Sequence, residues 1–385
     1  MEPERLTSSG ALAPSAGMVG AGQLARMTHS AAVELGVELR VLAAHPGDPA
    51  VLAGAASVIG SPDDPAAMLA LAADCDVVTF DHELVSPDAI AALEASGVAV
   101  RPSRAALAYA QDKLHARREL GALGFPVPRF AHATIAEDVE RFGEQIGWPI
   151  IGKAITGGYD GRGVFELASA DEGAEALASL PGGMLLEERL ALERELAIIV
   201  ARSPSGAMAL YPLVQTVQRD AMCREVLYPV AGGEHLAQSA RELASGISEA
   251  IGAVGVMALE LFETADGLLV NELALRPHNS GHYTIEACET SQFEQHLRAV
   301  LDLPLGSTAL REEAVASINV VGVEGDPRAH LAAALAVDGA HVHLYGKQPR
   351  PGRKLGHVTV CGEVPADVQA SARRAAALLE GRADD

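Results

Sequence analysis

The polar run from Asn271 to His282, Asn-Glu-Leu-Ala-Leu-Arg-Pro-His-Asn-Ser-Gly-His, carries the residue types of a reactive site. Arg276 suits a phosphate or a carboxylate, because its guanidinium group donates parallel hydrogen bonds. Neutral histidine, as at His278 and His282, suits proton exchange near pH 7. A solvated loop rarely needs arginine, two histidines, asparagine and serine together. The run is therefore predicted to take part in chemistry.

Two glutamates, Glu260 and Glu272, fall on neighbouring strands of a predicted hairpin, Val256–Phe262 and Gly267–Glu272. Magnesium takes a few hard oxygen ligands together with substrate phosphates. Two carboxylates that face one another across strands otherwise repel. Spacing alone leaves open whether they point to opposite faces or meet basic partners. The pair is therefore a candidate metal site.

A glycine-rich loop follows the predicted strand Ile150–Lys153, with five glycines between positions 152 and 163. Such a loop can close over a polyphosphate with its amides pointing inward, and Lys153 can reach an α- or β-phosphate. No G-x-x-x-x-G-K-[ST] run is present, so the loop is not a P-loop. An ordinary hairpin is the other interpretation. A simple turn, however, has little use for Tyr159, Asp160 and Arg162.

The segment Gly20–Ala25 matches the G-x-G-x-x-G/A dinucleotide fingerprint between a predicted strand, Ala16–Val19, and a predicted helix, Gln23–Leu35. Its amides can hold a phosphate at the helix N-terminus. A dinucleotide site also needs an acidic residue about 20 positions further on. The chain has Ala43-Ala44-His45 there, which disfavours NAD and FAD and leaves open a phosphate on another ligand.

A basic cluster stands out in a chain that has 29 Lys and Arg against 51 Asp and Glu, a formal charge of −22. It occupies a Pro/Gly loop and consists of Lys347, Arg350, Arg353, Lys354 and His357. The cluster can receive a phosphate monoester, and a solvated turn is the alternative. The acidity of the whole chain repels phosphate backbones, so nucleic acid is not expected as a partner.

Length and composition limit the number of domains and the cellular setting that we expect. The 385 residues suggest two or three domains. The four cysteines are far apart and form no Cys-x-x-Cys pair, which argues against a zinc or disulfide framework and fits a reducing cytoplasm. No run of about 18 apolar residues predicts a membrane span. We therefore expect a cytoplasmic protein with small-molecule substrates.

The elements that position these residues follow an α/β pattern. Strand, glycine turn, helix and strand succeed one another from residue 16 to 43, which predicts a parallel sheet. Ser86-Pro87 begins a helix, with serine as the cap and proline at the first helical position. Residues 104–120 are predicted as one helix. Beyond about residue 312, further strand-like runs precede an Ala-rich helix.

Five segments, in order along the chain, resemble the 5-(carboxyamino)imidazole ribonucleotide synthases, an ATP-grasp family of bacterial purine biosynthesis. They are residues 22–27, 157–163, 271–272 with 276–282, 291–294 and 350–357. The resemblance spans roughly Gly17 to Gly362. It implies four units: a flexible extension (1–16), a Rossmann-like pre-ATP-grasp domain (17–110), an ATP-grasp domain (111–312) and a small C-terminal mixed β/α domain (313–385).

The resemblance also implies an activity. Bicarbonate attacks the γ-phosphate of ATP to give carboxyphosphate, and the amine of 5-aminoimidazole ribonucleotide captures it or the CO2 that it releases. Magnesium, or manganese in its place, assists, and the protein is expected to be a homodimer. The alternatives are a sibling ATP-grasp enzyme such as the formate-dependent glycinamide ribonucleotide transformylase, a non-catalytic nucleotide-binding protein, and a dinucleotide oxidoreductase.

Site residues carry over by position. ATP is expected to contact Lys113, Lys153, Gly158, Tyr159, Asp160, Gly161, Arg162, Gly163, Val164, Glu187, Glu188, Arg189, Leu190, Glu195, Gln218, Asn271 and Glu272. Residues 158–164 form the lid and residues 187–190 the adenine hinge. The metal is expected on Glu260 and Glu272. Two departures from the family pattern are Leu275, where proline is usual, and Ala154-Ile155, which replaces an often polar pair.

The ribonucleotide and bicarbonate are expected to contact Gln23, Glu83, Tyr159, Asp160, Arg162, Arg276, His278, Asn279, Ser280, Lys347 and Arg353. Among these, the catalytic roles are expected for Arg276, His278, Asn279 and Asp160.

Overall fold

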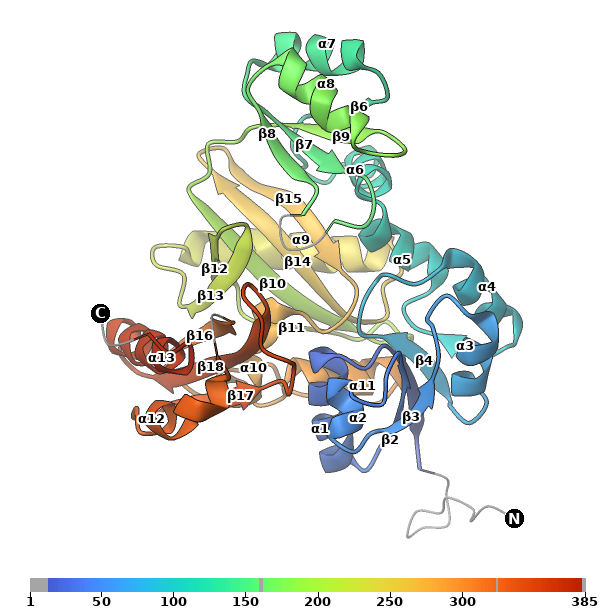
Figure 1. Cartoon of the computed structure of the whole chain (residues 1–385), viewed down its shortest axis with the longest axis vertical. Coiled ribbons are helices and arrows are strands. Elements are labelled where there is room, and N and C mark those ends of the chain that lie inside the picture. Colours follow the sequence, from blue (N-terminus) through green and yellow to red (C-terminus); the bar gives the residue numbers. More distant parts are fainter. Residues whose placement is uncertain (1–12, 159–161, 323–324, 383–385) are drawn as a thin grey trace.

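A computed structural model describes residues 13–158, 162–322 and 325–382, and builds them around three sheets (Figure 1). The predicted site residues Tyr159, Asp160 and Gly161 lie outside the described residues. The α/β fold class expected from the sequence is confirmed.

The N-terminal sheet is parallel, with strand order β3-β2-β1-β4-β5. Its elements are β1 (Ser15–Val19), α1 (Gln23–Leu35), β2 (Glu38–Ala43), α2 (Pro49–Leu52), β3 (Ala56–Ile59), α3 (Pro65–Ala72), β4 (Val77–Phe80), α4 (Pro87–Ala95) and β5 (Ala99–Val100). The serine cap of α4 is present, because Ser86 accepts a hydrogen bond from the Asp88 amide. The predicted extension is two residues too long, since Ser15 and Ala16 are buried in β1.

The helix predicted over residues 104–120 is two helices, α5 (Arg104–Gln111) and α6 (Lys113–Ala122). The break falls at Asp112, whose φ of −125° and ψ of 105° are extended. Its side chain accepts a hydrogen bond from the His115 amide at 2.8 Å and so caps α6. Aspartate competes with helical hydrogen bonding in this way, and that explains why apolar spacing alone missed the break.

A small antiparallel sheet of order β6-β9-β7-β8 stands apart at the top of Figure 1, with two helices on its outer face. Its elements are β6 (Phe130–Ala133), α7 (Ala136–Ile146), β7 (Ile150–Ala154), β8 (Val164–Leu167), α8 (Ala170–Ala178) and β9 (Met184–Glu188). The glycine-rich segment falls between β7 and β8 in the sequence.

The large sheet has the order β15-β14-β10-β12-β13-β16-β18-β17, with β11 beside β10. Its strands are β10 (Arg194–Arg202), β11 (Met208–Leu210), β12 (Val214–Arg219), β13 (Met222–Tyr228), β14 (Gly255–Thr264), β15 (Gly267–Ala274), β16 (Ala314–Val321), β17 (His341–Leu344) and β18 (Lys354–Gly362). β13 pairs with β16, so strands on both sides of the predicted boundary at 312/313 belong to one sheet.

Helices cover the large sheet and join it to the N-terminal sheet. They are η1 (Glu234–Leu236), α9 (Ala237–Ala250), η2 (Asn279–Gly281), α10 (Thr284–Ala287), α11 (Gln292–Val300), η3 (Pro327–His330), α12 (Leu331–Leu335) and α13 (Pro365–Leu379). None of the helices in the described part of the chain is long and apolar enough to cross a membrane.

Hydrophobic cores cross the predicted domain boundaries. One core includes both Ile90 of α4 and Ile247 of α9. A second joins Leu24 of α1 to Phe293 of α11 and to Tyr345, which follows β17. Because buried apolar contacts of this kind are the main source of stability, the N-terminal sheet is held firmly against the large sheet. The residues expected to bind ligand meet where the three sheets approach one another.

Gly143→Ala should destabilise the small upper sheet and its helices. Gly143 lies inside α7, and an added Cβ would fall 2.1 Å from the Trp148 ring. Overpacking of this kind costs about 1–3 kcal/mol, which outweighs the gain of about 1 kcal/mol that alanine brings to a helix. Trp148 is the single tryptophan of the chain, so its fluorescence during thermal unfolding reports on this region.

The matched control is Gly121→Ala in α6, where the added Cβ would meet Val127 at 3.5 Å, an ordinary contact. This variant should unfold at or slightly above the temperature of the parent protein. Equal melting temperatures for Gly143→Ala and the parent would contradict the described packing.

Candidate active site

The hairpin of β14 and β15 places Glu260 directly opposite Glu272 in the strand register. Residues paired in this way point to the same face of a sheet, so the two carboxylates lie side by side. The alternative left open by the sequence, opposite faces, therefore does not apply. Two strands away from β15, on β10, Glu195 adds a third carboxylate, whose charge also acts on Glu260.

The negative charges of Glu272 and Glu195 repel that of Glu260. Burial, together with the charges of Glu272 and Glu195, raises the pKa of Glu260 to about 8. Burial also disfavours the charge of Glu272, but Lys113 outweighs it and lowers the pKa of Glu272. The Lys113 ammonium lies 2.9 Å from the Glu272 carboxylate. At neutral pH, Glu260 thus holds a proton that a cation could replace.

Lys153, on β7, also acts on these carboxylates, because its charge helps to lower the pKa of Glu272. Its ammonium lies 2.7 Å from Glu187 and 3.3 Å from the Asn271 side-chain oxygen. Arg117, 3% exposed, pairs with the same Glu187 and donates to the carbonyls of Val270 and Asn271. Burial alone would raise the pKa of Glu187, but Lys153 and Arg117 outweigh it and lower it.

The predicted adenine hinge, residues 187–190, follows β9. The Glu187 side chain is committed to Lys153 and Arg117, and Glu188 accepts from the Arg129 backbone and side chain. The backbone after Glu188 is outside any strand and is therefore the part of this segment that can pair with a base. Arg189 lies 3.0 Å from Glu166, and Gln218 hydrogen-bonds Glu195.

The run after β15 turns from the carboxylates toward the N-terminal sheet. Arg276 donates to Glu83 at 2.8 Å, which joins the loop to the segment after β4. The other Glu83 carboxylate oxygen is buried without a partner among the described residues. Leu275, where the family usually has proline, is 2% exposed and packs in the core below the loop.

His278 contacts both halves of the site. Its Nδ1 accepts from the Ser280 amide at 3.3 Å, so the proton of the neutral ring is on Nε2, which lies 3.7 Å from Glu260. Burial, with the charges of Arg276 and Lys354, holds the pKa of His278 well below 6.5. The ring is therefore a neutral N–H donor at pH 7.

Gln292 fixes the backbone on either side of the His278 ring. Its side-chain oxygen accepts from the His278 amide at 2.8 Å, and its nitrogen donates to the His278 carbonyl at 2.7 Å. The side-chain nitrogen of the neighbouring Asn279 is buried without a hydrogen-bond partner among the described residues.

The glycine fingerprint does not offer its amides to an external phosphate. The Asp81 carboxylate, which follows β4, accepts the Gly22 amide at 2.8 Å. An added Cβ on Gly20 would lie 1.7 Å from the other Asp81 oxygen, so glycine is needed for this close approach. An acidic side chain thus stands where a dinucleotide phosphate would bind, which explains the fingerprint without NAD or FAD. Gln23 begins α1 beside it.

The basic C-terminal loop joins β17 to β18. Burial and the neighbouring Arg350 lower the pKa of Arg353, as expected where like charges gather without an anion. The Lys347 ammonium lies 5.7 Å from the centre of the Tyr345 ring. A Cβ on Gly346 would lie 3.6 Å from an Arg26 guanidinium nitrogen, so this loop meets α1.

Sequence reasoning assigned no role to two residues that the structure places at the site, Arg117 and Asp81, and it placed Lys354 only in the basic cluster that can receive a phosphate monoester. Arg117 follows Lys113 by four positions, so helical spacing predicts that both share one face of α6. Lys354 influences Glu260 and His278 electrostatically, and its position beside Arg353 was the available signal. No local pattern indicates that Asp81 meets the glycine turn.

Gly158 of the predicted lid lies near Lys113. A Cβ added to Gly158 would lie 3.9 Å from a side-chain carbon of Lys113. Gly163 has a φ of 75°, and its Cβ would meet Ala154 at 2.8 Å, so only glycine suits this turn. Val164 starts β8 at the far end of the loop.

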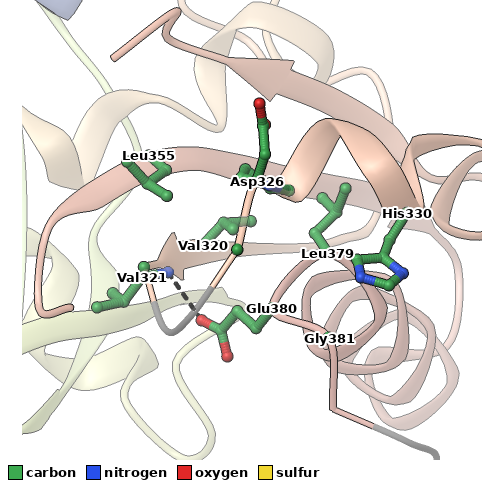
Figure 2. A pocket seen from close by; sticks show the side chains of 11 residues that line it. Val320, Val321, Asp326, His330, Leu355, Leu379, Glu380 and Gly381 are labelled. Atoms are coloured by element: carbon green, nitrogen blue, oxygen red, sulfur yellow. Dashed lines mark hydrogen bonds between the residues drawn. The ribbon is translucent and has the colours of Figure 1, made fainter. Parts of the chain in front are cut away.

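A separate cavity of about 20 Å³ lies in the C-terminal region (Figure 2). The Val321 amide donates to Glu380 at 2.8 Å at its wall, and Leu355 and Leu379 also line it. A cavity of this size holds at most about one water. None of the predicted site residues lines it.

Comparisons with known proteins agree with this arrangement. Three family models match in order: the ribonucleotide synthetase preATP-grasp domain (residues 14–111), the ATP-grasp domain (118–293) and the phosphoribosylaminoimidazole carboxylase C-terminal domain (315–371). The fold, with its grouped lysines and carboxylates, and the family matches define an ATP-grasp ligase, an enzyme that uses ATP.

The N5-carboxyaminoimidazole ribonucleotide synthase of Mycobacterium tuberculosis strain H37Rv is 48% identical, over 96% of this chain and 88% of that protein. The synthetase structure from Thermus thermophilus is 38% identical with a TM-score of 0.86, over 96% of this chain and 99% of that one. The Aspergillus clavatus synthase with ADP and 5-aminoimidazole ribonucleotide is 34% identical with a TM-score of 0.88, over the same shares. The chain belongs to the N5-carboxyaminoimidazole ribonucleotide synthase family.

Glu260→Gln should remove a pH-dependent part of the stability. The pKa of Glu260 is about 8 in the folded protein against 4.5 for an ordinary glutamate. The folded state therefore binds the extra proton between these values, and the contribution to stability falls as pH rises through this window. In a chelating buffer, the melting temperature of the parent should fall more between about pH 5 and pH 8 than that of Glu260→Gln.

Glu249→Gln is the control, because Glu249 is exposed on α9. Its melting profile should run parallel to that of the parent across the whole pH range. Parallel profiles for Glu260→Gln and the parent would show that the buried carboxyl carries no raised pKa.

Proposed function

We propose that the chain carboxylates the amine of 5-aminoimidazole ribonucleotide with bicarbonate and ATP, and releases ADP and phosphate. The observation that carries the proposal is the contact between His278 and Glu260, 3.7 Å between Nε2 and Oε1. It joins the lysine–carboxylate cleft, which suits phosphoryl transfer, to the Arg276–Ser280 loop, which suits a small oxyanion and an amine. The two half-reactions then share one enclosed space.

In the nucleotide half, Lys153 from β7 and Lys113 from α6 reach the phosphates of ATP. Each ammonium group contacts a carboxylate, Glu187 or Glu272, and a polyphosphate would draw both lysines toward itself. The backbone at residues 188–190 pairs with the adenine, and Glu195, oriented by Gln218, meets the ribose. Gly158–Val164 close over the phosphates and exclude water, because carboxyphosphate is short-lived.

The paired carboxylates fit a magnesium ion, with manganese as a substitute. Glu260 and Glu272 offer hard oxygen ligands on one face of the hairpin. The raised pKa of Glu260 is the result expected where neighbouring carboxylates repel one another, and a cation would relieve that repulsion. Glu260 and Glu272 would hold the ion, which would supply positive charge to offset the negative charge that develops during phosphoryl transfer.

In the acceptor half, a bicarbonate oxygen attacks the γ-phosphorus and the bond from that phosphorus to the bridging oxygen of ADP breaks. Arg276 and the neutral N–H of His278 bind the bicarbonate and then the carboxyl group of carboxyphosphate. The substrate amine attacks the carboxyl carbon of carboxyphosphate, or CO2 released from it. Phosphate leaves and the amine loses a proton. Asn279 and Ser280 complete this wall of the site.

The ribonucleotide spans the N-terminal and C-terminal regions. Its phosphate binds Lys347 and Arg353, where like charges gather, and its imidazole and ribose lie near Gln23 and Glu83. Arg162, Tyr159 and Asp160 are proposed on the same ligand, although the last two lie outside the described residues. A homodimer in the cytoplasm is part of the proposal.

Release of ADP should depend on every substrate. The assay omits ATP, bicarbonate or 5-aminoimidazole ribonucleotide in turn, in buffers freed of CO2, and follows ADP by a coupled assay. Each omission should reduce release to a small fraction of the complete reaction, and formate should not replace bicarbonate. Release that ignores the ribonucleotide would overturn the proposed substrate and leave the ATP-grasp fold standing.

Glu272→Gln should lower kcat by about 100-fold or more, because it removes one of the two carboxylates proposed to hold the magnesium ion that assists phosphoryl transfer. The magnesium concentration for half-maximal rate should rise in the same variant. Asp266→Asn, in the exposed turn of the same hairpin, is the control and should behave as the parent does. An unchanged kcat and magnesium dependence in Glu272→Gln would refute the metal assignment.

A further inference from the structure

A cluster of metal-ligand side chains lies away from the paired carboxylates, between α10 and the hairpin of β17 and β18. Glu286, His343 and His357 each offer a ligand atom, and these atoms lie within 4.8 Å of one another. Among the residues that the structure describes, no other group of three such side chains has this geometry. The cluster shares no residue with the proposed magnesium site.

Two buried atoms of the cluster have no hydrogen-bond partner among the described residues. They are Nε2 of His357, whose side chain is 0% exposed, and Oε2 of Glu286. Buried polar atoms are almost always satisfied, and an orphaned one calls for an unseen water or ion. Here two orphaned atoms, an imidazole nitrogen and a carboxylate oxygen, belong to one cluster. That combination matches a divalent transition metal, which both atom types ligate.

The surroundings orient these ligands as a metal site requires. The Tyr345 hydroxyl lies 2.8 Å from Nδ1 of His357. If Nδ1 donates to this oxygen, the lone pair of the ring is on Nε2, the orphaned atom. The Glu286 carboxylate lies 2.6 Å from Nε2 of His343, with a proton between them that a cation would replace.

The two histidines are paired in register across the hairpin, and their rings are stacked with centroids 4.5 Å apart and an interplanar angle of 14°. Parallel rings do not aim both nitrogens at one point, so one ring has to turn. The His343 side chain is 30% exposed at the edge of the cluster, whereas His357 is fully buried. His343 is therefore the ligand that adjusts.

We propose that Glu286, His343 and His357 bind a zinc-class divalent cation, with water as the fourth ligand. Two imidazoles and one carboxylate suit Zn²⁺ in tetrahedral coordination and suit Mg²⁺ poorly, because Mg²⁺ prefers oxygen ligands. Glu286 comes four residues after the His278–His282 segment, and the two histidines flank the loop that bears Lys347 and Arg353. The ion would link the segment after β15 to the β17–β18 loop, the two parts of the chain proposed to bind the ribonucleotide.

The test uses the full chain, stripped of metal by chelation and titrated with Zn²⁺ in excess Mg²⁺ against a chromogenic zinc chelator. We expect one equivalent of bound Zn²⁺ and a higher melting temperature. Glu286→Gln and His343→Gln should each weaken binding at least about tenfold. His341→Gln is the matched control, because His341 is exposed on the same strand two residues from His343. It should bind as the parent does.

Tyr345→Phe keeps all three ligands and removes the hydroxyl that orients His357, so it should weaken binding about 10- to 100-fold. Circular dichroism of each metal-free variant confirms that it is folded. Failure of the parent to bind one equivalent would overturn the proposal, as would parent-like affinity in folded Glu286→Gln and His343→Gln. A Co²⁺ titration supports tetrahedral coordination if it gives intense visible absorption that His343→Gln lacks.

Discussion

Two carboxylates held opposite each other on one hairpin are the constraint around which the active site is built. Neither Glu260 nor Glu272 can turn away, because the strand register fixes the side of the sheet on which each lies. The surrounding structure supplies positive charge from separate elements: Lys113 from the start of α6 and Lys153 from β7. The negative charge that the lysines do not offset, together with burial, raises the pKa of Glu260 to about 8. The two lysines and the paired carboxylates are the groups proposed to bind the nucleotide and its metal ion.

Local sequence patterns predicted most of the helices and strands near the site. They failed where a side-chain cap or a contact between distant residues determines the structure. The first two strands of the N-terminal sheet, β1 and β2, and the hairpin of β14 and β15 have clear apolar runs bounded by turn residues, so their positions follow from sequence. The break at Asp112 was missed, because one side-chain cap overrides the apolar spacing of a whole helix. The pairing of β13 with β16 joins residues about ninety positions apart, a contact that periodicity does not encode.

The predicted site residues divide in the same way. Family motifs indicated the lysines, the paired carboxylates and the Arg276 loop, and the structure brings these together; their roles stay predictions. The glycine fingerprint was set aside for want of an acid after β2, and the carboxylate that contacts it, Asp81, follows a strand 59 positions further along the chain. Arg117 was missed because its partner Glu187 and its two carbonyl acceptors are all distant in sequence.

The unbroken sheet from β15 to β17 determines how the chain can be divided or recombined. A fragment that ended at residue 312 would keep every residue assigned to ATP but would leave β13 with a bare hydrogen-bonding edge. Bare edges recruit strands from other copies, so such a fragment would tend to aggregate. Exchange of segments between relatives therefore has to respect the sheet: the C-terminal strands and the nucleotide strands are inherited as one folding unit, whereas the small upper sheet, whose strands pair only with one another, is the natural unit of exchange.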